Sequence, residues 1–473
     1  MNYKGILFFL GIFSLLVSFF SFLNILYSIY FNFNLDINSY IFSLMFSLII
    51  GIFFYILGRK NSKNISLSEQ IILIILSFFF IPILISIPYY LSVYDISLLN
   101  SYFESVSGFT TTGFSIIENI ETIDEPLLLW RSSSQWIGGL FFLLALIGTL
   151  GSRQAKIKPI YLVSGINIGG NFYNNFNSNF IRIVSIYFFS TIFIIFLYNF
   201  ANIRFFDSVN LSFTTISSGG FLTKNNLSEI LVNDFKILIL SLTLLFPIFN
   251  FYLFFKIFTK QFKFLDYRED LYLTILIIFI TLFFYFFIIP NEGFFNIFLG
   301  VISSISTSGI AIYSSNTDIS LFFILLTIIG GSLISTSSGF KYIRFYILLK
   351  NSYQEIYRLV KPINIFNRNL FHSEIKIDEE DTKIAFLVFI SFIASIFILS
   401  SILTLDSLSF ENSFKLSILT LTNTVSSNLY GLDNLNFLDL SNFTKISLVI
   451  FMIFGKIEII AILFLIKKFI FKE

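Results

Sequence analysis

Long runs of apolar residues dominate the chain, and few polar positions interrupt them. Eight runs cover residues 6–30, 40–58, 69–92, 126–150, 178–200, 233–257, 271–290 and 318–338, and two more cover 384–403 and 445–466. A helix that crosses a bilayer needs about 20 apolar residues, so these runs are predicted to be membrane spans. The first run is too long for the apolar part of a signal peptide and has no small-residue cleavage site after it. The pattern therefore predicts an all-α polytopic membrane protein.

Four of the segments between these runs follow one plan. Each starts with a semi-apolar stretch, at 98–109, 205–215, 293–305 or 410–424, that is too short to cross a bilayer. A small polar cluster then precedes the next run. The clusters are Thr110–Phe114, Ile216–Phe221, Ser306–Ile310 and Ser426–Gly431. A re-entrant helix that ends in a polar loop fits each of these segments.

The repeated plan divides the chain into four units of span, short helix, loop and span. We expect these pore units at 67–158, 174–262, 266–350 and 384–473, after an N-terminal pair of spans at 1–66. A cytoplasmic linker is expected at 351–383. Weak internal symmetry of this kind is typical of membrane transport proteins.

Composition narrows the function further. Hydrophobic residues make up 56% of the 473 residues and charged residues 12%, which excludes a soluble enzyme, a disordered chain and a coiled coil. The chain has no cysteine and one histidine, so thiolate chemistry and a histidine metal site are excluded. A net charge of +2 gives no electrostatic case for nucleic acid. Acidic residues are scattered through loops, so we expect no enzyme activity.

The charges also predict an orientation. With the N-terminus inside, 16 of the 28 acidic residues lie outside or at the outer ends of spans, and 24 of the 30 basic residues lie inside or within spans. This distribution follows the positive-inside rule and puts both termini in the cytoplasm. The acidic excess outside suits a protein that collects cations.

The polar clusters point to cation transport. Irregular backbone at membrane depth is tolerated only where it is buried or lines water. Four such loops around one axis would present rings of carbonyl and hydroxyl oxygens, which replace the hydration shell of an alkali cation. None of the clusters contains a charge. An ordinary turn, a membrane enzyme and a proton-coupled solute carrier remain alternatives, although mid-span carboxylates are nearly absent.

Several blocks of sequence resemble the Trk/Ktr/HKT potassium transporter superfamily, and its TrkH branch in particular. The most specific block is Phe103–Gly113, followed by Leu129–Ser132 and Gln135–Gly139. Further matches are Gly330–Ser332, Ser335–Thr336, Gly339–Lys341 and Gly455–Glu458. The resemblance covers nearly the whole chain.

This resemblance implies a potassium uptake protein of the bacterial inner membrane, with one filter strand per unit around a single pore. It implies a homodimer that docks on a ring of cytoplasmic, nucleotide-binding, TrkA-like regulatory subunits. Potassium is then the transported ion, and no cofactor is bound covalently. A sodium-permeable pore and a cation-coupled potassium symporter stay open as alternatives.

Filter residues follow from the resemblance position by position. They are Thr111, Thr112 and Gly113 in the first unit, Ser217, Ser218 and Gly219 in the second, and Thr307, Ser308 and Gly309 in the third. The fourth unit departs from the family's Asn-Asn-Leu-Gly-Pro-Gly stretch. An ungapped match there gives Asn428 and Leu429, with Leu429 in place of the filter glycine unless Gly431 takes that position.

The resemblance also supports a gate below the filter. The stretch 330–339 is rich in glycine and serine at membrane depth and is a poor helix. It is either a site of close helix packing or a loop that blocks the pore and moves on activation. Lys456 stands where the family commonly has arginine, deep in an apolar run; a charge balance with Glu458 is the alternative. The expected gating residues are Gly330, Gly331, Ser335, Thr336, Gly339 and Lys456.

Overall fold

The structure is a computed structural model. It describes residues 2–61, 66–150, 172–258, 260, 267–290, 292–312, 317–360, 369–372, 377–406, 408–432 and 435–457. The described residues form helices joined by turns and loops, with no β-strand among them. The predicted all-α class is therefore confirmed for this part of the chain.

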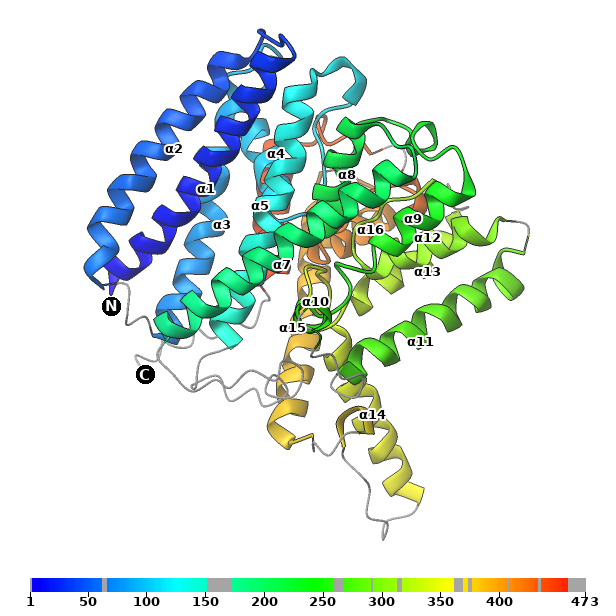
Figure 1. Cartoon of the computed structure of the whole chain (residues 1–473). Coiled ribbons are helices and arrows are strands. Elements are labelled where there is room, and N and C mark those ends of the chain that lie inside the picture. The colour runs from blue at the N-terminus through cyan, green and yellow to red at the C-terminus, as the bar shows by residue number, and fades with distance from the viewer. Residues whose placement is uncertain are drawn as a thin grey trace.

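Two antiparallel helices open the chain and lie at one edge of the molecule (Figure 1). They are α1 (Tyr3–Tyr30) and α2 (Ile37–Gly58), followed by the 3₁₀ turn η1 (Arg59–Asn61). A Cβ atom added to Gly11 would lie 2.7 Å from the backbone nitrogen of Tyr55, so glycine lets the two helices approach closely. Asn24 of α1 donates a hydrogen bond to the carbonyl of Pro126 and ties the pair to the rest of the bundle.

The remaining helices follow one order four times: a long helix, a twelve-residue helix, a loop and a further helix. The first set is α3 (Leu67–Tyr90), α4 (Leu98–Phe109), η2 (Ile120–Thr122) and α5 (Glu125–Leu150). The second is α7 (Phe172–Phe200), α8 (Phe205–Ile216), η3 (Leu227–Glu229), α9 (Asp234–Thr243) and α10 (Phe251–Phe258). The third is α11 (Arg268–Phe283), η5 (Phe284–Ile288), α12 (Phe294–Ile305), α13 (Thr317–Ile329), α14 (Tyr342–Val360) and η6 (Leu370–His372). The fourth is α15 (Glu379–Thr404), α16 (Phe410–Leu421), η7 (Asn428–Tyr430) and α17 (Asn442–Ile457).

Six of the described helices are long and apolar enough to cross a bilayer. They are Tyr3–Tyr30, Ile37–Gly58, Ser68–Tyr90, Phe180–Phe200, Arg268–Ile288 and Glu379–Thr404. Their outward faces carry large exposed apolar side chains such as Phe53, Phe196 and Phe279, as expected for surfaces that contact lipid.

Two runs that read as single spans are broken in the structure. The run 233–257 divides into α9 and α10, and residues 244–250 between them are not helical. Pro247 lies in this break, where its ring and missing N–H prevent a regular helix. The run 318–338 ends as a helix at Ile329, because Gly330 adopts a left-handed conformation with φ of 64°. Hydrophobicity alone did not reveal either break.

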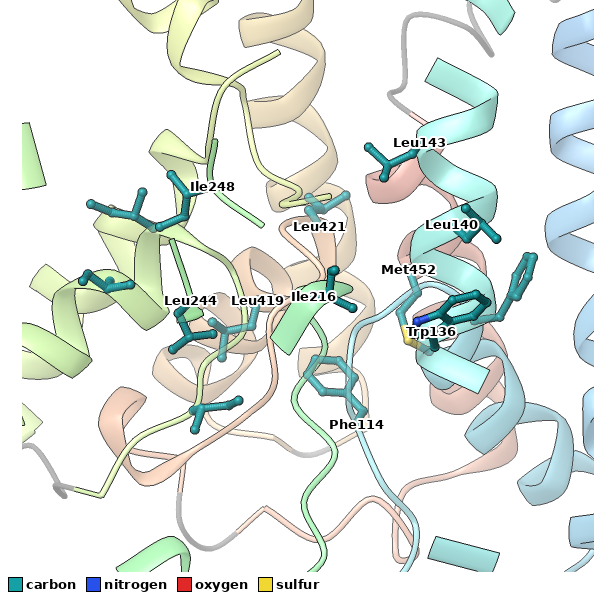
Figure 2. Packing of buried hydrophobic residues seen from close by; sticks show 14 of the residues in the cluster. Phe114, Trp136, Leu140, Leu143, Ile216, Leu244, Ile248, Leu419, Leu421 and Met452 are labelled. Atoms are coloured by element: carbon teal, nitrogen blue, oxygen red, sulfur yellow. The ribbon is translucent and has the colours of Figure 1, made fainter. Parts of the chain in front are cut away.

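The four twelve-residue helices lie at the centre of the bundle, and the residues of their last two turns are buried except for the partly exposed Phe213. Apolar side chains from different repeats pack around the loops that follow them (Figure 2). The labelled residues come from α5 (Trp136, Leu140, Leu143), α8 (Ile216), α9 and its break (Leu244, Ile248), α16 (Leu419, Leu421), α17 (Met452) and the first loop (Phe114). The core therefore holds these four loops in place.

Candidate functional site

Each twelve-residue helix ends in the same turn. The residue after the helix keeps nearly helical angles, and the next residue is left-handed. The left-handed residues are Thr111, Ser218, Thr307 and Asn423, with φ of 59°, 56°, 60° and 49°. The following amide then bonds a carbonyl five residues back, as in Thr112 N to Ser107 O at 2.9 Å. The equivalent bonds are Gly219 N to Thr214 O, Ser308 N to Ser303 O and Thr424 N to Leu419 O. The four loops therefore share one backbone geometry.

This shared turn defines the register of the loops. We number positions 1 to 4 from the residue that follows each helix, so that the left-handed residue is position 2. The four loops read Thr110-Thr111-Thr112-Gly113, Ser217-Ser218-Gly219-Gly220, Ser306-Thr307-Ser308-Gly309 and Thr422-Asn423-Thr424-Val425. Glycine occupies position 4 in three loops and valine occupies it in the fourth.

In the first and third loops the residues expected from the sequence stand at positions 2 to 4, and in the other two loops they stand elsewhere. Ser217, Ser218 and Gly219 stand at positions 1 to 3, so Gly220 and not Gly219 is at position 4. Two adjacent glycines made this choice ambiguous in the sequence.

In the fourth loop the shared turn lies before the residues expected from the sequence. Asn428 and Leu429 lie in η7, beyond Val425, and Gly431 closes that turn with φ of 65°. Position 4 of this loop is not a glycine. An alignment that matches the family's filter glycine to a glycine of this chain therefore selects a position further along the sequence.

The four position-4 residues meet at one place. A Cβ atom added to Gly113 would lie 3.2 Å from both the amide nitrogen of Gly220 and Cβ of Val425. One added to Gly220 would lie 2.7 Å from the carbonyl oxygen of Ser308, and one added to Gly309 would lie 2.8 Å from that of Val425. The four loops, which are far apart in the sequence, are therefore in contact around a common centre.

The carbonyl oxygens at positions 2 to 4 accept no hydrogen bond within the described part of the chain. The side chains beside them are engaged elsewhere: the hydroxyls at positions 1 and 3 are 2.7 Å apart in the first loop and 3.0 Å apart in the third and fourth. Buried carbonyls without donors are costly unless a ligand satisfies them. An uncharged cage of such oxygens suits a monovalent metal cation.

Residues 330–340 lie directly against position 2 of the second and third loops, and we call them the intramembrane segment. Thr336 donates to the carbonyl of Ile216 at 2.9 Å, and its own carbonyl accepts from Ser218 at 3.0 Å. The amide of Ser338 donates to Oγ1 of Thr307 at 3.0 Å. The sequence-predicted residues Gly330, Gly331, Ser335, Thr336 and Gly339 all belong to this buried segment.

Two buried lysines hold the intramembrane segment in place. Nζ of Lys456 donates to Thr111 Oγ1 at 2.7 Å, Ser338 Oγ at 2.9 Å and the Thr336 carbonyl at 3.2 Å. Nζ of Lys341 donates to the carbonyls of Ser337 and Ser335 at 2.6 and 3.2 Å. Both ammonium groups face the ring of Phe142, at 4.4 Å for Lys456 and 5.5 Å for Lys341. Both lysine side chains therefore lie on the side of the loops that faces this segment.

The intramembrane segment is also bonded to the break between α9 and α10. The Ser332 amide donates to the Ile248 carbonyl at 2.8 Å, and the Phe251 amide donates to the Ile334 carbonyl at 2.9 Å. Glu269 of α11 accepts from the Leu333 amide at 3.1 Å. Backbone N–H and C=O groups that lack partners within a helix at the two breaks thus form hydrogen bonds with each other. Non-helical backbone is tolerated at membrane depth when its polar groups are paired in this way.

A buried ion pair supports the first two loops from behind. Arg131 Nε lies 3.0 Å from Glu104 Oε1, and both side chains are at most 1% exposed. Glu104 also accepts the Ile116 amide at 2.9 Å, and the guanidinium lies 4.3 Å from the centre of the Phe221 ring. Gln135 fills the space beside Gly219, because a Cβ atom there would lie 2.2 Å from its Oε1. No role was assigned to Glu104, Arg131 or Gln135 from the sequence. The signal that could have identified the first two is a pair of opposite charges in a chain with few charged residues.

A pocket of about 520 Å³ lies on the other side of the loops, and we call it the vestibule. Its floor includes Gly113, Gly220, Gly309 and Val425, and its wall includes Glu118 and Lys224. The carbonyl cage therefore lies between an open polar vestibule and the intramembrane segment with its two lysines.

Two aspartates meet outside the spans, at the ends of α2 and α5. Burial, and then the charge of Asp36, raises the pKa of Asp124 to about 6. Burial likewise raises the pKa of Asp36, whose Oδ1 accepts the Val93 amide. Tyr94 donates to Asp124 at 3.3 Å. This pair is a candidate proton-binding group away from the carbonyl cage.

Comparisons with known proteins point in one direction. The chain is 27% identical to an uncharacterized cation transporter of Methanocaldococcus jannaschii, over 99% of this chain and 96% of the relative. It is 24% identical to the Trk system potassium uptake protein TrkG of Escherichia coli, over 88% of both chains. No protein-family model matches the chain.

The fold also has a solved counterpart. The crystal structure of the potassium transporter TrkH from Vibrio parahaemolyticus aligns with a TM-score of 0.85 and 21% sequence identity, over 98% of both chains. The order of helices and loops is thus shared along nearly the whole length of both proteins.

Proposed function

Because the homologues of this chain are Trk system potassium uptake proteins and its fold is that of TrkH, we propose that it conducts potassium ions across a bacterial inner membrane. The observation that carries this proposal is the carbonyl cage, in which four equivalent turns leave buried oxygens without donors. The filter then consists of positions 2 to 4 of the four loops.

The pore is built from four units around one axis. They correspond to residues 67–158, 174–262, 266–350 and 384–473, with the pair 1–66 outside the pore and 351–383 as a cytoplasmic linker. The equal lengths of α4, α8, α12 and α16 and their identical C-terminal turns support this symmetry. These helices act as re-entrant helices, and their C-terminal partial negative charges favour a cation between them.

The filter selects by replacing water with oxygen ligands. A potassium ion that enters from the vestibule loses its hydration shell to the free carbonyls at positions 2 to 4. In the first, third and fourth loops the hydroxyls at positions 1 and 3 bond to each other, so these loops present their backbones with little freedom to rearrange. No charged side chain is needed in the cage, and an ion can leave it as readily as it enters.

The intramembrane segment acts as the gate. It covers the filter on the side away from the vestibule and is held there by Lys341 and Lys456. Opening requires these hydrogen bonds to break, which needs a second arrangement of the segment that a partner can favour. We assign this task to a cytoplasmic, nucleotide-binding, TrkA-like subunit that acts on a homodimer, with both termini of the chain in the cytoplasm.

Sodium permeation remains the second candidate, because valine replaces glycine at position 4 of the fourth loop. When one of the four loops differs from the others, the oxygen atoms around the ion are arranged less symmetrically. The filter then replaces the hydration shell less completely, which weakens its selection of potassium over sodium.

Uptake of rubidium in a bacterial strain that lacks its own potassium transporters tests the function. We expect wild type and Gly293→Ser to take up rubidium, because a Cβ atom at Gly293 would meet nothing closer than 3.7 Å. Gly113→Ser should lose preference for rubidium over sodium, since Gly113 has φ of 83° and contacts two other loops. Equal ion preference in Gly113→Ser and wild type, at equal amounts in the membrane, would contradict the filter assignment.

A further inference from the structure

Val425 occupies the place that glycine holds in the other three loops. It follows Thr424 at position 4, directly after the same left-handed turn that leads to Gly113, Gly220 and Gly309. Its φ is not positive, as expected for a β-branched residue. The fourth loop therefore shares the turn that leads to position 4, but there it carries a branched side chain on a backbone without the positive φ of Gly113 and Gly309.

The side chain of Val425 lies among the other three loops. A Cβ atom added to Gly113 would lie 3.2 Å from Val425 Cβ and Cγ2, and one added to Gly220 would lie 2.6 Å from Val425 Cβ. One added to Gly309 would lie 2.6 Å from Val425 Cγ1. Only a group that stands between the loops can be this close to all three, so the isopropyl group lies at their common centre.

Val425 also separates the filter from the vestibule. Gly113, Gly220 and Gly309 are buried, whereas Val425 is partly exposed, and all four line the vestibule. An ion that passes from the vestibule into the carbonyl cage must therefore pass the isopropyl group. Valine has few rotamers, so its side chain moves out of the path of an ion less readily than a flexible side chain does.

We propose that Val425 is a specificity-determining residue, which narrows the vestibule end of the filter and limits passage by ion size. This inference rests on the proposed function, because it assumes that alkali cations cross the four loops. The narrowed end hinders large ions more than small ones, so the chain discriminates against rubidium and caesium more strongly than a filter with four glycines.

Uptake of four ions by graded variants tests this proposal. We expect Val425→Ala and Val425→Gly to raise uptake progressively, with the gain increasing from sodium through potassium and rubidium to caesium. For Val425→Gly the gain in rubidium uptake should be about tenfold, equivalent to about 1.4 kcal/mol in the barrier. The nearly isosteric Val425→Thr should keep the wild-type order of ions, because the size of the side chain is retained.

Val17→Ala is the matched control, because Val17 is a fully buried valine of α1, away from the loops. The same gain for all four ions in Val425→Ala and Val425→Gly, or a gain in Val425→Thr, would overturn the size mechanism. Reduced uptake at normal membrane levels would show that Val425 supports the filter instead of narrowing it, and would also overturn the proposal.

The same experiment separates failure of this inference from failure of the proposed function. If wild type and Val17→Ala take up potassium and the Val425 variants match them for every ion, only the role of Val425 is wrong. If no variant takes up any alkali cation, the transport function fails and the inference fails with it.

Discussion

Lys456 brings a buried ammonium group against position 2 of the first loop, in the proposed filter, which makes it the most informative single residue. Its ammonium bonds Thr111 of the first loop and two groups of the intramembrane segment. A buried cation at this place repels a permeating cation and also fixes the gate. It therefore combines two effects that mutation can separate.

We expect Lys456→Gln to raise rubidium uptake and Lys456→Arg to leave it near the wild-type rate. Removal of about 1 kcal/mol of repulsion corresponds to about fivefold in rate. The measurement is initial uptake in cells, normalised to the amount of protein in the membrane. A rate for Lys456→Gln at or below that of Lys456→Arg would mean that the charge neither blocks the ion nor holds the gate.

The second residue-scale prediction concerns pH and stability. The pKa of Asp124 is raised to about 6 in the folded protein, above its usual 3.8, so the folded state keeps a proton that the unfolded state loses. Stability from this group is therefore greatest below pH 4, falls as the pH rises through about 6, and is constant above that. The full change is at most about 3 kcal/mol, since one pKa unit equals about 1.4 kcal/mol.

Thermal unfolding of the purified protein between pH 4 and pH 7 measures this effect. Asp36, Tyr94 and Tyr40 face Asp124 and are retained in Asp124→Asn, so the difference between the two proteins reports the Asp124 carboxyl together with its effect on Asp36. We expect the stability of wild type to fall relative to Asp124→Asn over this range. Parallel curves would show that Asp124 keeps an ordinary pKa.

At the scale of elements, the intramembrane segment and the break between α9 and α10 form one unit. Each supplies backbone groups that the other needs, including the Ser337 amide that donates to the Pro247 carbonyl at 3.1 Å. Gly330 and Gly339 permit the sharp turns at the ends of the segment, with φ of 64° and 80°. The intramembrane segment is therefore part of a pair of broken helices and not an isolated loop.

We expect deletion of residues 335–339 to raise cation uptake in cells without a regulatory subunit, because a shortened segment cannot reach the filter. Gly330→Ala should act in the same direction but more weakly, since a Cβ atom there would lie 2.4 Å from the Ser338 carbonyl. Gly293→Ala serves as the control. Uptake that falls, or that still requires the subunit, would identify the segment as packing.

At the scale of the whole molecule, the vestibule and α14 belong to opposite sides of the membrane in the proposed orientation. The chain has no cysteine, so a single introduced thiol reports its side without background. Ser228 near the vestibule and Ser352 on α14 are both exposed.

We expect a membrane-impermeant maleimide to label Ser228→Cys in intact cells and Ser352→Cys only after the membrane is opened. Labelling of Ser352→Cys in intact cells, with Ser228→Cys labelled only after the membrane is opened, would show that the orientation is the reverse of the proposed one. It would also place the vestibule on the cytoplasmic side.

The sequence by itself determined the helical membrane class, and it predicted the plan of the four units and the chemistry of the loops. These follow from length and composition, because an apolar run of bilayer length has no other stable fold and a short polar loop between spans must be buried or line water. The resemblance led to Trk proteins, and the similarity to TrkG and the fold of TrkH agree with it. Thr111–Gly113 and Thr307–Gly309 were assigned to the filter because the polar cluster in each of these two loops contains a single glycine.

Tertiary structure alone decided the register of the second and fourth loops, the break between α9 and α10 and the contacts of the buried charges. A left-handed residue can be Thr, Ser or Asn, so the turn that places Gly220 and Val425 at position 4 has no unique sequence signature. Asn423 is at position 2 because a helix ends at Leu421, and that end depends on the packing of α16 against its neighbours. Likewise Lys456 and Thr111 are 345 residues apart, so only the assembled bundle brings the lysine to the filter.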